Sequence, residues 1–116
     1  MCTVSYLPRK RGFVLTSNRD EDKNRASQVI FPEEMEFDED VILFPKDPKG
    51  GGTWIACDNN SRAVTLLNGA FERHHQESTY RKSRGLVVLD TFGYDNIADF
   101  PKNYNFSGIE PFTLVL

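Results

Sequence analysis

The chain has 116 residues, of which 39% are hydrophobic and 27% charged, with a net charge of −3. This length allows one domain with a modest core, and the composition is that of a globular protein, which argues against disorder. Seventeen acidic residues against fourteen basic ones argue against a nucleic-acid partner. The two cysteines form no disulfide framework, no apolar run approaches the ~18 residues that cross a bilayer, and the N-terminus lacks a secretory pattern. We therefore expect a cytoplasmic protein without a membrane span.

The first predicted element is a β-hairpin. Residues 3–7 and 12–16 are β-prone, and the sequence Pro8-Arg9-Lys10-Arg11 separates them. Cys2 begins the first strand, and the second strand runs back antiparallel and ends in the polar run 17–20. We therefore expect this polar run to lie beside Cys2.

The middle of the chain predicts a surface excursion followed by a second hairpin. Residues 21–40 are polar and read as extended or loosely folded surface. The glycines at 50–52 predict a turn, after which the β-prone runs 53–57 and 62–67 flank an Asp-Asn-Asn-Ser sequence. Cys57, at the end of the first of these runs, is expected in the core.

The last third of the chain predicts two helices and a closing strand. Ser83 is placed to cap an apolar helix, and a second short helix is expected over 95–100, with Pro101 ending it. Residues 112–116 are apolar and β-prone, and the chain stops inside this run, which we interpret as truncation of a longer domain. Strands first and helices afterwards predict an α+β fold.

Cys2 is the candidate for chemistry. Methionine is normally removed before a small second residue, which would leave a thiol and a free α-amine on Cys2. Thiols and α-amines have ordinary pKa values of about 8.5 and about 8, so such an amine can take the thiol proton near neutral pH. Arg19 would favour the thiolate, Asp20 would hold the amine by hydrogen bonds, and Asn68 would donate to an oxyanion. From these residues alone, a buried structural cysteine and a solvated strand end are the commoner alternatives.

Four ordered motifs resemble one known family. They are Met1-Cys2-Thr3, Asn18-Arg19-Asp20-Glu21, Gly51-Gly52-Thr53-Trp54 and Leu67-Asn68. Their order and spacing are similar to those of the NRDE family, which includes the transport-and-Golgi-organisation proteins. That family in turn resembles the N-terminal-nucleophile (Ntn) hydrolases, including penicillin V acylase and the bile-salt (choloylglycine) hydrolases. Ser83-Arg84-Gly85 and Tyr104-Asn105 also match, so the resemblance covers essentially the whole chain.

The resemblance implies a four-layer αββα sandwich, of which the single domain at 1–116 holds the first part. It makes Cys2 the nucleophile, Asp20 its amine partner and Asn68 an oxyanion donor. The implied activity is that of a cysteine amidohydrolase, which cleaves a non-peptide carbon–nitrogen amide bond in a small molecule through a thioester and without a cofactor.

The resemblance has one departure and leaves one competing function. In the bile-salt hydrolases an arginine precedes the aspartate by three positions, where this chain has Ser17, while Arg19 is adjacent to the aspartate. Substrate contacts are expected from Asn18, Gly52 and Trp54. The competing function is that of a non-catalytic member with a role in trafficking or in binding lipid or haem, and a third reading is an inactive fragment. The substrate and the oligomeric state are left open.

Two further motifs predict no site. His74 and His75 are adjacent, and no cysteine or carboxylate stands at metal-ligand spacing, so we interpret them as part of a polar loop without a metal. The glycine-rich run 50–53 lacks the Gly-Lys-Ser/Thr ending of a phosphate loop and leads into a strand. We expect its glycines to form a turn that brings backbone close to the nucleophile.

Overall fold

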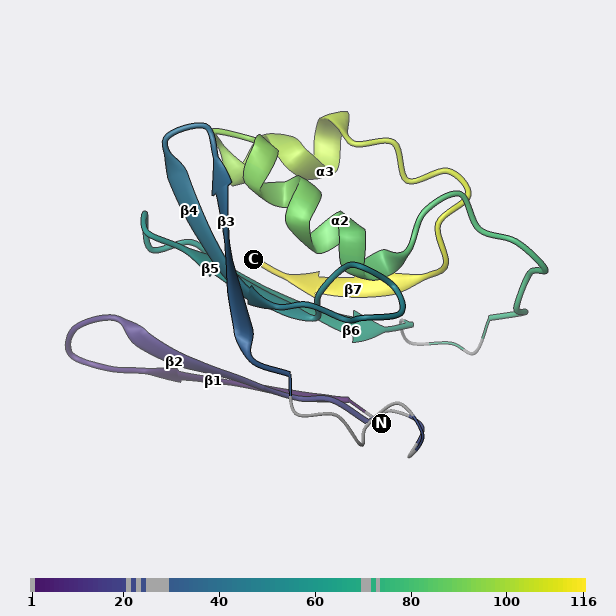
Figure 1. The fold of residues 1–116 in the computed structure, drawn as a ribbon, viewed down its shortest axis with the longest axis horizontal. Helices are drawn as coiled ribbons and strands as arrows, with labels where there is room; N and C mark the ends of the chain where they lie inside the picture. Colours follow the sequence, from purple (N-terminus) through teal and green to yellow (C-terminus); the bar gives the residue numbers. More distant parts are fainter. Residues whose placement is uncertain (1, 21, 23, 25–29, 70–71, 73) are drawn as a thin grey trace.

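The structure is a computed structural model that describes residues 2–20, 22, 24, 30–69, 72 and 74–116 (Figure 1). Met1 and Glu21 of the sequence motifs lie outside the described residues. The elements are the strands β1 (Thr3–Pro8), β2 (Phe13–Asn18), β3 (Pro32–Phe37), β4 (Asp40–Pro45), β5 (Ile55–Asp58), β6 (Ala63–Asn68) and β7 (Phe112–Val115), the helices α2 (Arg84–Asp90) and α3 (Phe100–Asn103), and the 3-10 turns η1 (Thr91–Gly93) and η2 (Ile97–Asp99).

The strands form two antiparallel sheets. The β1–β2 hairpin is one sheet, and the other has five strands in the order β3-β4-β5-β6-β7. Figure 1 shows α2 and α3 on one side of the five-stranded sheet and the hairpin on the opposite side. The α+β prediction is confirmed, whereas the complete four-layer sandwich stays a prediction.

The core lies between the five-stranded sheet and the helices. Alternate residues of the strands point toward α2, where they are removed from water. The buried cluster consists of Ile42, Phe44, Ala56, Val64, Leu66, Val88 and Phe92.

No helix among the described residues is long and apolar enough to cross a membrane.

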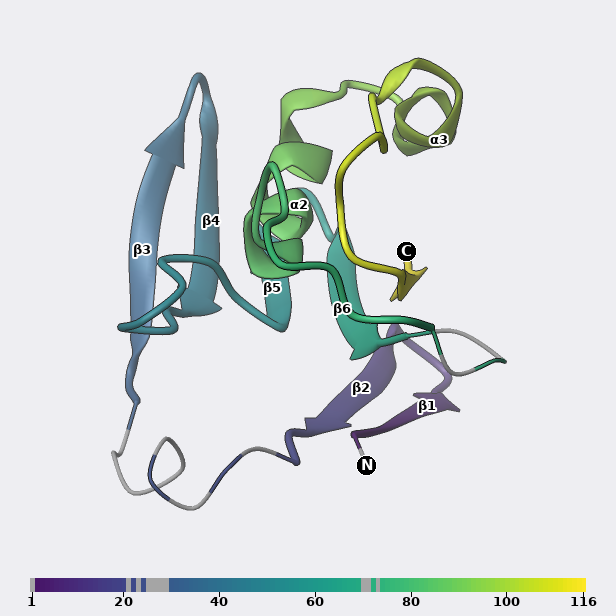
Figure 2. The ribbon, with the colours of Figure 1, turned by 90° about the vertical axis from the view of Figure 1, so that its right-hand side faces the viewer.

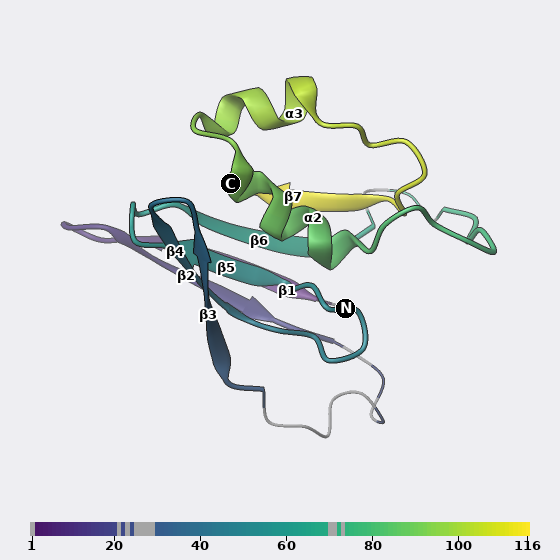
Figure 3. The same cartoon turned by 45° about the horizontal axis from the view of Figure 1, so that its top comes forward.

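The N-terminal hairpin has the predicted register. Thr3 pairs with Asn18 and Pro8 with Phe13, and the N–H of Arg9 donates to the carbonyl of Gly12 at 3.1 Å to close the turn. Cys2 precedes the Thr3–Asn18 pair and the polar run follows it, so both lie at the same end of the hairpin. In Figure 3 the hairpin runs beneath β5 and β6.

The prediction of a loose excursion over 21–40 is wrong for its second half. Residues Pro32–Phe37 form β3, which pairs with β4 at one edge of the five-stranded sheet (Figure 2). The three glutamates of this segment led to the prediction of a surface loop. A strand at the edge of a sheet tolerates charged side chains, however, and Met35 of this strand packs against the core. Residues 25–29 of the excursion lie outside the described residues.

Pro101 does not end the second helix. The predicted segment is the 3-10 turn η2, and Asn96 caps it by accepting a hydrogen bond from the N–H of Ala98 at 3.0 Å. Pro101 then lies in the first turn of α3. Proline is tolerated there because the first N–H groups of a helix have no partner within it. Ser83 occupies the N-cap position of α2, as predicted, but its side chain makes no capping hydrogen bond.

Cys57 is exposed, which corrects the prediction that it belongs to the core. Successive residues of a strand point to opposite faces of the sheet. Ala56 faces the helices and is buried, so Cys57 faces the side on which the hairpin lies. There it lines an apolar cavity of about 270 Å³ together with Leu15 and Leu43.

Candidate active site

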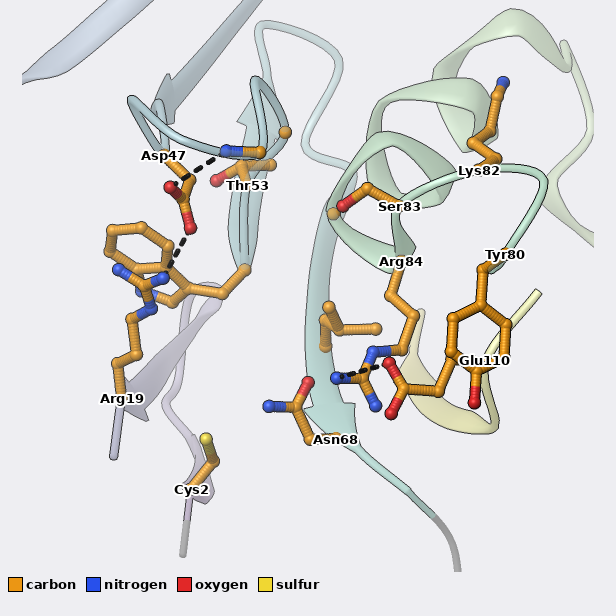
Figure 4. Close-up of a pocket in the computed structure, with 15 residues that line it drawn as sticks. Cys2, Arg19, Asp47, Thr53, Asn68, Tyr80, Lys82, Ser83, Arg84 and Glu110 are labelled. Atoms are coloured by element: carbon orange, nitrogen blue, oxygen red, sulfur yellow. Dashed lines mark hydrogen bonds and ion pairs between the residues drawn. The ribbon is translucent and has the colours of Figure 1, made fainter. Parts of the chain in front are cut away.

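A cavity of about 300 Å³ lies where the N-terminal hairpin, the loop before β5 and the start of α2 meet (Figure 4). Five of the predicted site residues line it, namely Cys2, Arg19, Gly52, Trp54 and Asn68. Asn18 and Asp20 are not among the described residues that line it. The expected neighbourhood of Cys2, the polar run and the end of the second hairpin is therefore present.

The thiol of Cys2 is half-buried and contacts the main chain of Asp20. The N–H of Asp20 donates to Sγ at 3.5 Å, and Sγ lies 3.9 Å from the carbonyl oxygen of the same residue. The hairpin register explains this contact. Thr3 pairs with Asn18, and Cys2 and Asp20 lie just beyond that pair at the same end of the hairpin. A backbone N–H directed at sulfur is a donor that a thiolate accepts well. The described contact of Asp20 with Cys2 is made by its backbone, and the expected role of its carboxylate stays a prediction.

Arg19 points toward the loop before β5. Its Nη2 lies 2.5 Å from Oδ2 of Asp47, and its guanidinium stacks on the ring of Trp54 at 4.4 Å from the centroid (Figure 4). The side chains of Arg19 and Asp47 are only 19% and 14% exposed, so this ion pair is partly shielded from water. The interactions thus connect the end of the hairpin to the wall of the cavity.

Asp47 is a site residue that the sequence analysis missed. Its Oδ1 accepts hydrogen bonds from the N–H groups of Lys49 at 2.9 Å and Gly50 at 3.2 Å, while its Oδ2 binds Arg19. Its own N–H donates to the carbonyl of Gly52 at 2.7 Å. A sequence signal existed, because an aspartate before Pro-Lys-Gly is typical of a turn in which the carboxylate accepts from later N–H groups.

Gly52 and Gly85 allow the loop to touch the first turn of α2. The N–H of Thr53 donates to the carbonyl of Gly85 at 3.0 Å. A Cβ atom on Gly52 would lie 2.2 Å from the carbonyl carbon of Gly85, closer than atoms can approach. The glycine turn was expected to bring backbone close to the nucleophile, and Gly50 and Gly52 do line the cavity together with Cys2.

Asn68 ends β6 and projects toward the cavity between Cys2 and the opposite wall (Figure 4). Its backbone is fixed by the pairing of β6 with β7, in which it faces Phe112. Its side-chain amide makes no hydrogen bond with another residue in the described part of the chain. The Nδ2–H group is thus available to a ligand.

A second ion pair forms the opposite wall. Arg84 Nη2 lies 3.0 Å from Oε2 of Glu110, and Arg84 Nη1 donates to the carbonyl of Pro111 at 3.2 Å. The other oxygen of Glu110 lies 3.1 Å from Nε2 of His74. The sequence analysis gave none of these residues a role at the site, although Arg84 belongs to a family motif. Glu110 follows from no sequence pattern, because it lies 26 positions after its partner Arg84.

Behind this wall, a carboxylate on α2 binds two side chains. Asp90 Oδ2 lies 2.5 Å from Lys82 Nζ and accepts a hydrogen bond from the hydroxyl of Tyr104 at 2.5 Å. Burial, together with this hydrogen bond and the charge of Asp90, raises the pKa of Tyr104 above its ordinary value. Tyr104 therefore stays a neutral donor that helps hold Lys82 and Asp90 in place.

The fold and the cavity define a mixed α+β protein with a cysteine at the start of its first strand, facing a polar cavity. The family model for Transport and Golgi organisation 2 matches residues 1–116, and the chain belongs to this family, which is the NRDE family that its motifs resemble. No match was found among curated proteins or among solved structures. Among the described residues no group of three or more histidine, cysteine, aspartate or glutamate side chains could hold a metal ion.

Proposed function

We propose that the chain carries the nucleophile of an Ntn-type cysteine hydrolase that cleaves amide bonds in small molecules. The observation that carries this proposal is the position of Cys2, whose thiol lines the cavity and receives the N–H of Asp20 at 3.5 Å. Asn68 lines the same cavity with an amide that has no partner in the described part of the chain. A nucleophile and an oxyanion donor at one cavity are the minimum that acyl transfer requires.

The first half of the reaction forms a thioester. After removal of Met1, the free amine of Cys2 takes the proton of its own thiol, and the sulfur attacks the carbonyl carbon of the amide. The carbonyl π electrons move to oxygen, which accepts a hydrogen bond from Asn68 Nδ2. As the tetrahedral intermediate collapses, the carbon–nitrogen bond breaks and the leaving amine takes the proton from the Cys2 ammonium.

The second half hydrolyses the thioester. The amine of Cys2 takes a proton from water, whose oxygen attacks the thioester carbon, and the oxyanion again binds Asn68. Collapse breaks the carbon–sulfur bond, releases a carboxylic acid and returns the proton to the thiol. Asp20 holds the amine in the proposed mechanism, and the backbone contact of Asp20 with Cys2 supports its placement there.

The first experiment is the intact mass of the chain expressed without an N-terminal tag. Removal of Met1 is expected, because the α-amine must belong to Cys2. If Met1 is retained in all molecules, the mechanism cannot operate and the hydrolase proposal is wrong.

The second experiment is covalent capture with a thiol-reactive amide analogue. Faster labelling is expected at Cys2 than at Cys57, which is exposed and thus serves as an internal control in the same molecule. Cys2→Ser should abolish the fast labelling, and Cys57→Ser should preserve it. Equal labelling rates at the two cysteines would contradict the proposal and favour a non-catalytic binding protein.

A further inference from the structure

We propose that the cavity at Cys2 selects small, polar amides and rejects amides that carry long hydrocarbon chains. This inference rests on the proposed function, because it concerns the substrate of the same site. It follows from the size of the cavity and from the two ion pairs that form its walls.

The size of the cavity limits the ligand. A volume of about 300 Å³ is at the lower end of the range that ligand pockets occupy. A compact amide fits this space, whereas a long hydrocarbon chain would extend beyond it.

The wall next to the hairpin is charged. Arg19 and Asp47 lie 2.5 Å apart, and both line the cavity. The carboxylate of Asp47 also accepts two backbone N–H groups of its own loop, so it is fixed in place. Trp54 contributes an aromatic ring to this wall, but the guanidinium of Arg19 stacks on that ring. The surface offered to a ligand here is therefore polar.

The wall across the cavity is charged as well. Arg84 and Glu110 lie 3.0 Å apart, their side chains are 19% and 20% exposed, and both line the cavity. The hydroxyl of Tyr80 also belongs to this wall and accepts the N–H of Glu77 at 2.9 Å. Figure 4 shows Asn68 between Cys2 and this ion pair, so a ligand that extends from Cys2 past Asn68 would meet the pair.

Hydrocarbon placed against such walls is unfavourable. Covering an ion pair with apolar groups removes its remaining water without replacing the lost hydrogen bonds, while polar groups replace them. The chain does contain an apolar cavity, of about 270 Å³ near Leu15, Leu43 and Cys57, but Cys2 does not line it. The nucleophile is thus associated with the polar cavity.

The test uses two haloacetamides of similar length, N-iodoacetylglycylglycinamide and N-hexyl-iodoacetamide, on the untagged chain. Alkylation rates at Cys2 and Cys57 are measured by peptide mass, and the Cys2 rate is divided by the rate of the same reagent with glutathione, because Cys57 lines an apolar cavity that itself favours the hexyl reagent. This ratio cancels the intrinsic reactivity of each reagent. We expect this ratio to be about tenfold higher for the polar reagent, since pocket contacts discriminate by this order.

Two outcomes separate the inference from the function on which it rests. If Cys2 reacts faster than Cys57 and the hexyl reagent gives an equal or higher ratio, the substrate class is wrong while the nucleophile stands. If Cys2 reacts no faster than Cys57 with either reagent, the proposed function itself fails. Both outcomes are read from the wild-type chain and need no variant.

A double variant tests whether the wall across from Cys2 contributes to the preference for the polar reagent. In the double variant Arg84→Met/Glu110→Gln, the roughly tenfold preference for the polar reagent should fall to about threefold, because the Arg19–Asp47 pair still lines the cavity. The matched control is Lys102→Met/Asp99→Asn, which removes an exposed ion pair outside the cavity and should keep the full preference. Equal preferences in the two double variants would show that the Arg84–Glu110 pair does not select the substrate.

Discussion

Asp47 shows how one carboxylate can order both a loop and a neighbouring side chain at a cavity. One of its oxygens accepts two N–H groups of the glycine loop, and the other binds the guanidinium that follows β2. Arg19 was expected beside the thiol, and its described partners are Asp47 and Trp54 instead. The family motif predicted the position of Arg19, but a residue 28 positions away determines where its side chain points. No local pattern contains that information.

We expect Tyr104 to make the stability of the protein sensitive to alkaline pH. Burial raises its pKa in the folded state, whereas in the unfolded chain it titrates near its ordinary value of about 10. Above this pH the unfolded state loses the proton while the folded state keeps it, so the free energy of unfolding falls as the pH rises. Urea unfolding between pH 9 and pH 11.5 should show a less steep fall for Tyr104→Phe than for the wild type.

The control for this measurement is Tyr6→Phe. Tyr6 is 60% exposed, so its replacement should leave the slope unchanged. The same slope in Tyr104→Phe and in the wild type would mean that Tyr104 does not cause the alkaline loss of stability.

Among the elements, those defined by local patterns were predicted best. Both predicted hairpins and the helix after Ser83 follow from β-prone runs, turn residues and a cap position. The edge strand β3 was missed because its three glutamates are typical of a surface loop. They are compatible with a strand only because β3 pairs with β4, and that pairing is not visible in the local sequence. Pro101 was predicted to end a helix, but it lies in the first turn of α3. A proline can occur at either boundary of a helix, and the direction of the chain in the folded protein decides which one.

The contact between the glycine loop and α2 predicts a large effect of one methyl group. Gly52→Ala should destabilise the protein by about 1–3 kcal/mol, because the new Cβ would overlap the backbone of Gly85. Urea unfolding measures this loss. Gly50→Ala is the matched control, since its Cβ would have its nearest neighbour at an ordinary 3.5 Å, the hydroxyl of Ser83, and should change the stability by less than about 0.5 kcal/mol. Equal effects of the two substitutions would contradict a specific role for the Gly52–Gly85 contact.

The two sheets of the molecule differ in how far their side chains are buried. All of the fully buried core residues belong to the larger sheet, the loop before β5 and the helical side, while most side chains of β1 and β2 are exposed. The β-prone runs of both predicted hairpins could be recognised in the sequence, but the face of each strand that packs could not, as Cys57 shows. The cavity depends on how the two sheets meet, which is why both of its ion pairs escaped prediction.

Native-state hydrogen exchange should reveal this division. Isolated two-stranded hairpins are marginally stable, so the hydrogen-bonded amides of β1 and β2 should exchange well before those of β5 and β6. Mass spectrometry of peptides from residues 3–18 and 55–68 measures the difference. Equal protection of the two segments would mean that the hairpin and the larger sheet open as one unit.

Charge connects the two parts of the cavity. Cys2 belongs to the hairpin and Asn68 to the larger sheet, and the Arg19–Asp47 ion pair and the stacking of Arg19 on Trp54 connect the end of the hairpin to the loop before β5. Dissolved salt screens exposed charges strongly but partly buried pairs much less, and these two side chains are only 19% and 14% exposed. The distance between Cys2 and Asn68 is thus held partly by an ion pair that salt weakens little, so the cavity should keep its shape over a wide range of salt concentration.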